Sequence, residues 1–201
     1  MSKKVNFWNL PNILTLLRIA VVPVIAVFLW NIRDSKAPNE AKMMMSSIVA
    51  CIIFSAAMIT DVIDGYLARK WDLVTPMGAY LDPLADKLMV TTALIMLIPL
   101  ERVPAWVVAL LLCREITITG LRGIASQQGF TISASALGKI KTAFQSVAIG
   151  MLLWFFPVNF PLIGETNVYS CGIVLLFVSL FFSLVSAIEY FILYAHSAKS
   201  T

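Results

Sequence analysis

Six apolar segments, each close to the length needed to cross a lipid bilayer, make up most of this chain. They lie at about residues 9–30, 43–68, 79–100, 104–124, 139–157 and 168–195. A transmembrane helix needs about 20 predominantly apolar residues, whereas the strands of a membrane barrel alternate over about ten. Because lipid cannot satisfy backbone polar groups, the segments are predicted to be helices. The sequence thus predicts an all-α polytopic membrane protein with six transmembrane helices, forming a single domain over residues 1–201.

Composition supports a membrane protein and argues against soluble classes. Of the 201 residues, 60% are hydrophobic and only 13% are charged, whereas soluble domains carry roughly 25% charged residues. The net charge of +4 is better explained by topology and anionic lipid headgroups than by nucleic acid, so we expect membrane lipids and no nucleic acid as partners. The three cysteines lie in apolar stretches and imply neither a disulfide framework nor a zinc site.

The distribution of lysine and arginine predicts that both termini are cytoplasmic. Cytoplasmic segments tend to carry the excess of these residues. With the N-terminus inside, the cytoplasmic side holds Lys3, Lys4, Arg69, Lys70, Arg122, Lys139, Lys141 and Lys199. The opposite side holds Arg33, Lys36, Lys42 and Arg102. In this topology the polar residues within the spans gather on the cytoplasmic side, which predicts a cavity that opens there.

Four aspartates lie in the second and third apolar segments. Asp61 and Asp64 are three residues apart and Asp82 and Asp86 are four apart, so each pair projects from one helical face. The two segments are predicted to be antiparallel neighbours joined by a short loop containing Pro76, which lets the carboxylates converge. One Asp at the centre of a membrane helix costs roughly 2.5–3.5 kcal/mol, and like charges repel. Oxygen-rich clusters hold hard divalent cations, so we predict two Mg²⁺ or Mn²⁺ ions of the kind that assist displacement at phosphorus.

Two glycines and an arginine flank the carboxylates. Gly65 and Gly78 weaken a helix but let a large ligand approach its backbone, and Arg69 can neutralise a phosphate. Each residue alone also fits helix packing or topology, and a single Asp could serve a proton relay. A carboxylate-based ion transporter is the alternative from another class, although the chain shows neither the broken helices nor the internal repeat common in transporters. A structural membrane subunit would not need four converging acids.

The spacing Asp61-x2-Asp64-Gly65-x2-Ala68-Arg69-x8-Gly78-x3-Asp82-x3-Asp86 resembles the full signature of the CDP-alcohol phosphatidyltransferase family. The resemblance implies six transmembrane helices, a homodimer, and transfer of a phosphatidyl group from a CDP-lipid to an alcohol. It also implies that the four aspartates ligate metal, with Asp86 also acting as general base. Asp61, Gly65, Ala68, Arg69 and Gly78 would surround the CDP-lipid.

The acceptor must be inferred outside this signature. Arg114, Arg122, Lys139 and Lys141 form a basic group on the fourth and fifth segments and suit an acceptor that carries a phosphate. Arg114 lies inside a span and needs a partner, and the adjacent Glu115 is expected to point elsewhere. Lys139 and Lys141 are two residues apart and cannot share a helical face; both, Lys141 above all, also fit a topological anchor.

Three further segments resemble the bacterial phosphatidylglycerophosphate synthase branch of the family. They are Pro11-Asn12-Ile13-Leu14-Thr15-x2-Arg18, Arg114-Glu115-Ile116-x3-Gly120-Leu121-Arg122 and Gly138-Lys139-Ile140-Lys141-Thr142. The implied reaction joins CDP-diacylglycerol and sn-glycerol 3-phosphate to give phosphatidylglycerol phosphate and CMP in the bacterial inner membrane. Arg122 and Lys139 would bind the acceptor phosphate with support from Arg114, while Asn12, Thr15 and Arg18 would border the nucleotide or diphosphate. Inositol phosphate, serine or phosphatidylglycerol remain alternative acceptors.

Overall fold

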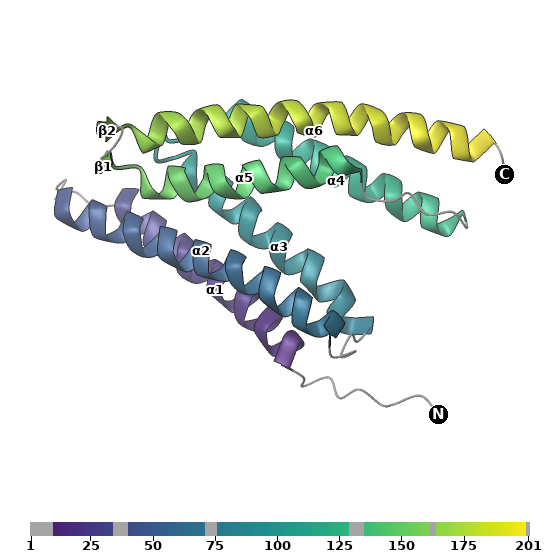
Figure 1. Ribbon diagram of the computed structural model, residues 1–201, viewed down its shortest axis with the longest axis horizontal. Helices are drawn as coiled ribbons and strands as arrows, with labels where there is room; N and C mark the ends of the chain where they lie inside the picture. Colours follow the sequence, from purple (N-terminus) through teal and green to yellow (C-terminus); the bar gives the residue numbers. More distant parts are fainter. Residues whose placement is uncertain (1–9, 34–39, 71–75, 129–134, 161–163, 200–201) are drawn as a thin grey trace. The chain divides into compact units, whose positions relative to one another are not determined.

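The computed structural model describes residues 10–33, 40–70, 76–128, 135–160 and 164–199. Their elements are α1 (Leu10–Arg33), α2 (Glu40–Lys70), α3 (Pro76–Leu97), α4 (Ala105–Gln127), α5 (Ala136–Trp154), β1 (Val158–Phe160), β2 (Gly164–Thr166) and α6 (Val168–Lys199). The six expected helices are therefore present (Figure 1). Pro76 is the first residue of α3 rather than part of the loop before it, a position where its missing N–H costs nothing.

The described residues confirm the all-α fold class and add one short hairpin that the sequence did not predict. Strands β1 and β2, between α5 and α6, pair antiparallel with Val158 opposite Thr166 and Phe160 opposite Gly164. Their three residues each are too few to show the period-2 pattern that predicts a strand from sequence.

The chain forms two compact units. In the first, residues 1–101 and 153–156, helix α1 packs along both α2 and α3, and the three helices lie side by side in Figure 1. Their shared core is apolar and nearly inaccessible to solvent, built from Ile25, Leu29, Phe54, Met89 and Leu94. Near the N-terminal end of α1, the polar residues Asn12, Thr15 and Arg18 are buried in this unit. They form the first part of the candidate site.

In the second unit, residues 102–152 and 157–201, α6 packs against α4 and also contacts α5. The contact with α5 is close, because a Cβ placed on Gly172 would lie 3.0 Å from the Leu152 side chain and 3.1 Å from that of Met151. Phe144 and Phe182 stack between the same two helices with ring centroids 5.9 Å apart.

Three of the described helices are long and apolar enough to cross a membrane. These stretches are Asn12–Arg33, Glu40–Asp61 and Val168–His196. Helices α3, α4 and α5 each carry charged residues of the candidate site within their apolar sequence, which lowers their mean hydropathy. The structure thus supports membrane integration through α1, α2 and α6.

Candidate active site

Two of the four aspartates are held by the same stretch of α1. Arg18 Nη1 lies 2.6 Å from Asp61 Oδ1 of α2 in an ion pair, and Thr15 donates its hydroxyl to Asp82 Oδ1 of α3. Thr15 and Arg18 are one turn apart, so a single face of α1 contacts both carboxylates. This arrangement brings the second and third predicted segments together at the aspartates.

The polar face of α1 is buried. Asn12, Thr15 and Arg18 are 2%, 0% and 3% exposed, and their spacing of three residues places them on one side of the helix. The sequence suggested that they border a nucleotide or diphosphate. The contacts of Thr15 and Arg18 with aspartates were not anticipated, although polar residues repeated every three positions in an apolar helix are a signal for such partners.

The carboxylate oxygens of Asp61 and Asp82 are suitable ligands for a hard divalent cation. Asp61 and Asp82 are close enough for their charges to repel, and Arg18 supplies a positive charge beside Asp61. Carboxylate oxygens are the ligands that Mg²⁺ and Mn²⁺ prefer. Within the described ranges no set of three His, Cys, Asp or Glu side chains is already grouped around one point. Asp86 lies one turn after Asp82 on α3 and is half-buried.

The glycines of the signature differ in their surroundings. Gly65 is half-buried in α2, and a Cβ added there would meet none of the described atoms within 4 Å. Gly78, in the first turn of α3, is buried. The side chains of Asp64, Ala68 and Arg69 lie outside the part of the chain that the structure describes, so their predicted roles stay predictions.

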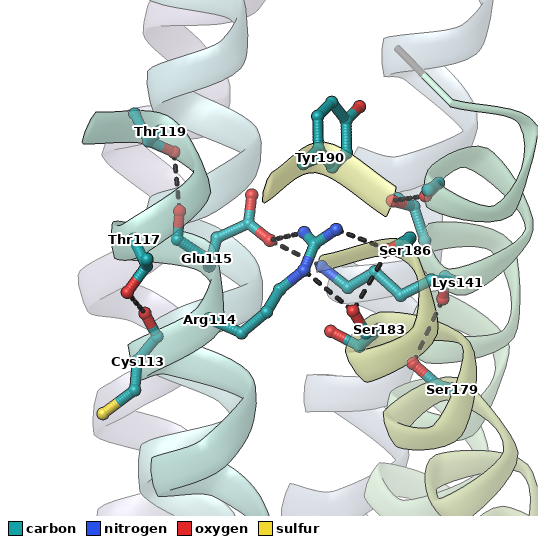
Figure 2. Close-up of polar contacts among 12 residues, drawn as sticks. Cys113, Arg114, Glu115, Thr117, Thr119, Lys141, Ser179, Ser183, Ser186 and Tyr190 are labelled. Carbon is teal, nitrogen blue, oxygen red and sulfur yellow. Dashed lines mark hydrogen bonds and ion pairs between the residues drawn. The ribbon is translucent and has the colours of Figure 1, made fainter. Parts of the chain in front are cut away.

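A second polar cluster lies in the other unit and centres on Arg114 of α4 (Figure 2). Its Nε donates to the Ser183 carbonyl at 3.1 Å and its Nη2 to Ser186 Oγ at 2.6 Å, both on α6. Nη1 lies 3.4 Å from Glu115 Oε2. The side chain is only 8% exposed and therefore needs partners inside the protein. Ser183 and Ser186 of α6 and the adjacent Glu115 supply them.

The expectation that Glu115 points elsewhere was wrong. Its Oε2 accepts from Lys141 Nζ at 2.6 Å as well as from Arg114, as Figure 2 shows. Adjacent residues on a helix diverge at the backbone, but the long Arg114 side chain bends back far enough to reach the carboxylate. Lys141 is 7% exposed on its side chain whereas Lys139 is exposed, which confirms that the two lysines occupy different faces of α5.

Arg122 and the start of α5 meet at one tyrosine of α6. Arg122 Nη2 donates to the hydroxyl oxygen of Tyr190, and its guanidinium carbon lies 4.8 Å from the ring centroid. The backbone N–H of Ser135 donates to the same oxygen at 2.9 Å. Among the described residues the buried Nε of Arg122 and the buried Oε2 of Glu189 have no hydrogen-bond partner.

Sequence reasoning missed the polar face of α6. Ser179, Ser183, Ser186 and Tyr190 follow one another at intervals of four, three and four residues, and all are buried. That spacing places them on one helical face. Ser179 donates to the Lys141 carbonyl at 3.1 Å, so the face contacts α5 as well as α4. The spacing is present in the sequence, but the surrounding residues are so apolar that a polar face does not stand out there.

Comparison with known proteins extends the resemblance beyond the aspartate signature to most of the chain. Residues 8–188 match the CDP-alcohol phosphatidyltransferase family model. The chain belongs to this family. Dependence on a divalent metal is general among CDP-alcohol phosphatidyltransferases, in agreement with the carboxylate donors of α2 and α3.

Several curated members of the family are similar over most of their length. The CDP-diacylglycerol–glycerol-3-phosphate 3-phosphatidyltransferase of Bacillus subtilis is 40% identical over 192 residues, covering 92% of this chain and 94% of its own. The probable phosphatidylglycerophosphate synthase of Mycobacterium tuberculosis is 39% identical, covering 90% and 79%. The CDP-diacylglycerol–glycerol-3-phosphate 3-phosphatidyltransferase of Rickettsia typhi is 35% identical, covering 91% and 95%.

Proposed function

We propose that this chain is a membrane transferase that moves a phosphatidyl group from CDP-diacylglycerol to sn-glycerol 3-phosphate, giving phosphatidylglycerol phosphate and CMP. The names of its relatives support this reaction. The single structural observation that carries it is the pair of aspartates from α2 and α3 held by one face of α1. That arrangement suits a reaction at a diphosphate in which a carboxylate-bound cation takes part.

The aspartates would hold two divalent cations, Mg²⁺ or Mn²⁺. The ligands proposed are Asp61, Asp64, Asp82 and Asp86. When bound, such cations stabilise charge on the diphosphate and on the departing CMP. Thr15 and Arg18 keep two of the carboxylates in place, and each fixed carboxylate lowers the entropy lost when substrate binds.

Other residues of the first unit would bind the CDP-lipid. They are Asn12, Thr15, Asp61, Gly65, Ala68, Arg69 and Gly78. The surroundings of Gly65 support this proposal, because no described atom would lie within 4 Å of a Cβ placed there and a nucleotide could approach the α2 backbone. Arg69 would offset phosphate charge.

In the chemical step the acceptor hydroxyl oxygen attacks the phosphorus that carries the diacylglycerol. A new P–O bond forms, the bond to the CMP oxygen breaks, and CMP leaves with that electron pair. The hydroxyl proton passes to the Asp86 carboxylate, which requires it to lie within about 3 Å of the hydroxyl.

The basic residues of the second unit would bind the acceptor phosphate. Arg122 and Lys139 are proposed to contact it, with Arg114 and Lys141 supporting them. The buried Nε of Arg122, unpartnered among the described residues, supports this assignment because a phosphate oxygen would satisfy it. Arg114 and Lys141 already hold protein partners, so their support is mainly to fix α4 and α5.

We further propose six membrane spans with both termini in the cytoplasm, a single domain, a homodimer, and residence in the bacterial inner membrane with the site facing the cytoplasm. The excess of lysine and arginine on one side supports this orientation. The three long apolar helices support integration in the membrane.

The test is Asp86→Asn together with acceptor competition. Asp86→Asn should abolish CMP release while CDP-diacylglycerol binding persists, because the amide cannot take the hydroxyl proton. In the unchanged protein, glycerol 3-phosphate should compete with labelled acceptor far better than serine, inositol phosphate or phosphatidylglycerol. Full turnover by the Asp86→Asn variant would refute the role of Asp86 as general base. A preference for another acceptor would refute glycerol 3-phosphate as the substrate.

A further inference from the structure

Tyr190 of α6 contacts Arg122 and Ser135, the residue before the helix that carries Lys139. It is 2% exposed, and its hydroxyl oxygen accepts hydrogen bonds from Arg122 of α4 and from the backbone N–H of Ser135. Its ring also lies under the Arg122 guanidinium, 4.8 Å from centroid to carbon. One side chain thus contacts the guanidinium through both its hydroxyl and its ring.

The second bond of Tyr190 reaches the first turn of α5. Ser135 precedes Ala136, the first residue of that helix, and its hydroxyl accepts from the Gly138 N–H at 3.1 Å. This is a helix N-cap, in which the side chain satisfies one of the free N–H groups of the first turn. Lys139 follows Gly138 directly. Holding the Ser135 N–H therefore fixes the turn from which Lys139 extends.

We propose that Tyr190 is a positioning residue for the acceptor phosphate, acting through Arg122 and through the Ser135 cap of α5. This inference rests on the proposed function of Arg122 and Lys139. The Tyr190 hydroxyl accepts a hydrogen bond from Arg122 Nη2. The Nε–H and the remaining N–H groups of the guanidinium can still donate to an anion. An arginine held in this way loses little further side-chain freedom on binding, whereas an untethered one must be ordered by the ligand.

The test compares Tyr190→Phe with Tyr194→Phe. Both lose one hydroxyl and keep the ring, and both lie on α6 one turn apart. The Tyr194 hydroxyl contacts Gln128 Oε1 at 3.2 Å on the exposed side. For Tyr190→Phe we expect the KM for glycerol 3-phosphate to rise about tenfold, as for loss of one hydrogen bond to a charged group. The KM for CDP-diacylglycerol and the kcat should change less than twofold, and Tyr194→Phe should change none of them.

A merely structural role would give a different result. Tyr190→Phe would then lower thermal stability and the active fraction, which reduces the apparent kcat and leaves both KM values unchanged. That outcome overturns the proposal.

Arg122→Gln separates this proposal from the function on which it rests. If Arg122→Gln raises the KM for glycerol 3-phosphate and Tyr190→Phe adds little to it in the double variant, Tyr190 acts through Arg122 as proposed. If Arg122→Gln raises that KM but Tyr190→Phe alone does not, the role of Tyr190 is refuted and the acceptor site stands. If Arg122→Gln leaves it unchanged, the acceptor assignment fails, and the role of Tyr190 fails with it.

Discussion

The ion pair between Glu115 and Lys141 predicts a measurable coupling between α4 and α5. The charged atoms are 2.6 Å apart, and the two side chains are 30% and 7% exposed. Replacing Glu115 by Gln would leave the Lys141 ammonium buried without its carboxylate. Breaking a fully buried pair costs about 3–5 kcal/mol. Because Glu115 retains some contact with solvent, we expect the loss to be about 2–3 kcal/mol.

Replacing Lys141 by Met should cost less. The methionine fills a similar apolar volume, and Glu115 keeps Arg114 at 3.4 Å and its solvent exposure. The double variant carries neither an unpaired ammonium nor a broken pair, so its loss should fall below the sum of the single losses by about 1–2 kcal/mol. Such a deficit is the coupling energy of the pair.

The assay is thermal unfolding of the purified protein in one detergent at fixed pH and salt. For a chain of this size, 2–3 kcal/mol corresponds to a fall of about 5–10 °C in Tm. Glu40→Gln is the matched control, since Glu40 is exposed in the first turn of α2, and its Tm should stay within about 2 °C of the parent. Strictly additive effects, or a Glu115→Gln variant as stable as the control, would refute the reasoning.

Three further predictions concern other parts of the molecule. Thr15→Val removes the hydroxyl that is hydrogen-bonded to Asp82 and should lower kcat/KM for CDP-diacylglycerol about tenfold. Thr60→Val, which loses a bond to the Ala56 carbonyl on the exposed side of α2, should leave kcat/KM unchanged. Equal losses in the two variants would refute the role of Thr15 in holding Asp82. Gly172→Ala places a Cβ 3.0 Å from Leu152 and should destabilise the protein by about 1–3 kcal/mol in thermal unfolding. Gly123→Ala, whose Cβ would meet no described atom within 4 Å, should stabilise it by up to about 1 kcal/mol. The reverse order would contradict the packing of α5 on α6. Burial lowers the pKa of Arg102, in the connection before α4, to about 10. Above this pH the folded protein has released the proton while the unfolded chain still holds it, so stability rises with pH. Relative to Arg102→Met, the unchanged protein should gain about 1 kcal/mol of stability between about pH 9 and 11, and no relative gain would contradict the assignment.

Much of the helical layout was predictable from sequence, for a physical reason. Lipid requires long apolar helices, so stretches such as Asn12–Arg33 and Val168–His196 stand out by composition alone. The β1–β2 hairpin was not predictable, because three residues per strand are too few to show a period. Helix ends were less predictable: Pro76 was expected in the loop before α3 but is the first residue of that helix.

The candidate site was predictable in its residue types and less so in its contacts. The aspartate spacing is local and readable, whereas the pairing of Arg18 with Asp61 depends on how α1 packs against α2. The same holds for Tyr190, which lies 55 residues from Ser135 along the chain. Glu115 shows the limit of backbone reasoning, since side-chain length decided its contact with Arg114.

The most direct test of the proposed reaction is CMP release by the purified protein in detergent micelles. The assay contains CDP-diacylglycerol and Mg²⁺, with and without glycerol 3-phosphate, and uses Asp86→Asn as the inactive control. We predict release that requires both the cation and glycerol 3-phosphate and yields phosphatidylglycerol phosphate in equal amount. Release that does not depend on glycerol 3-phosphate, or no release under conditions where CDP-diacylglycerol binds, would contradict the proposed function.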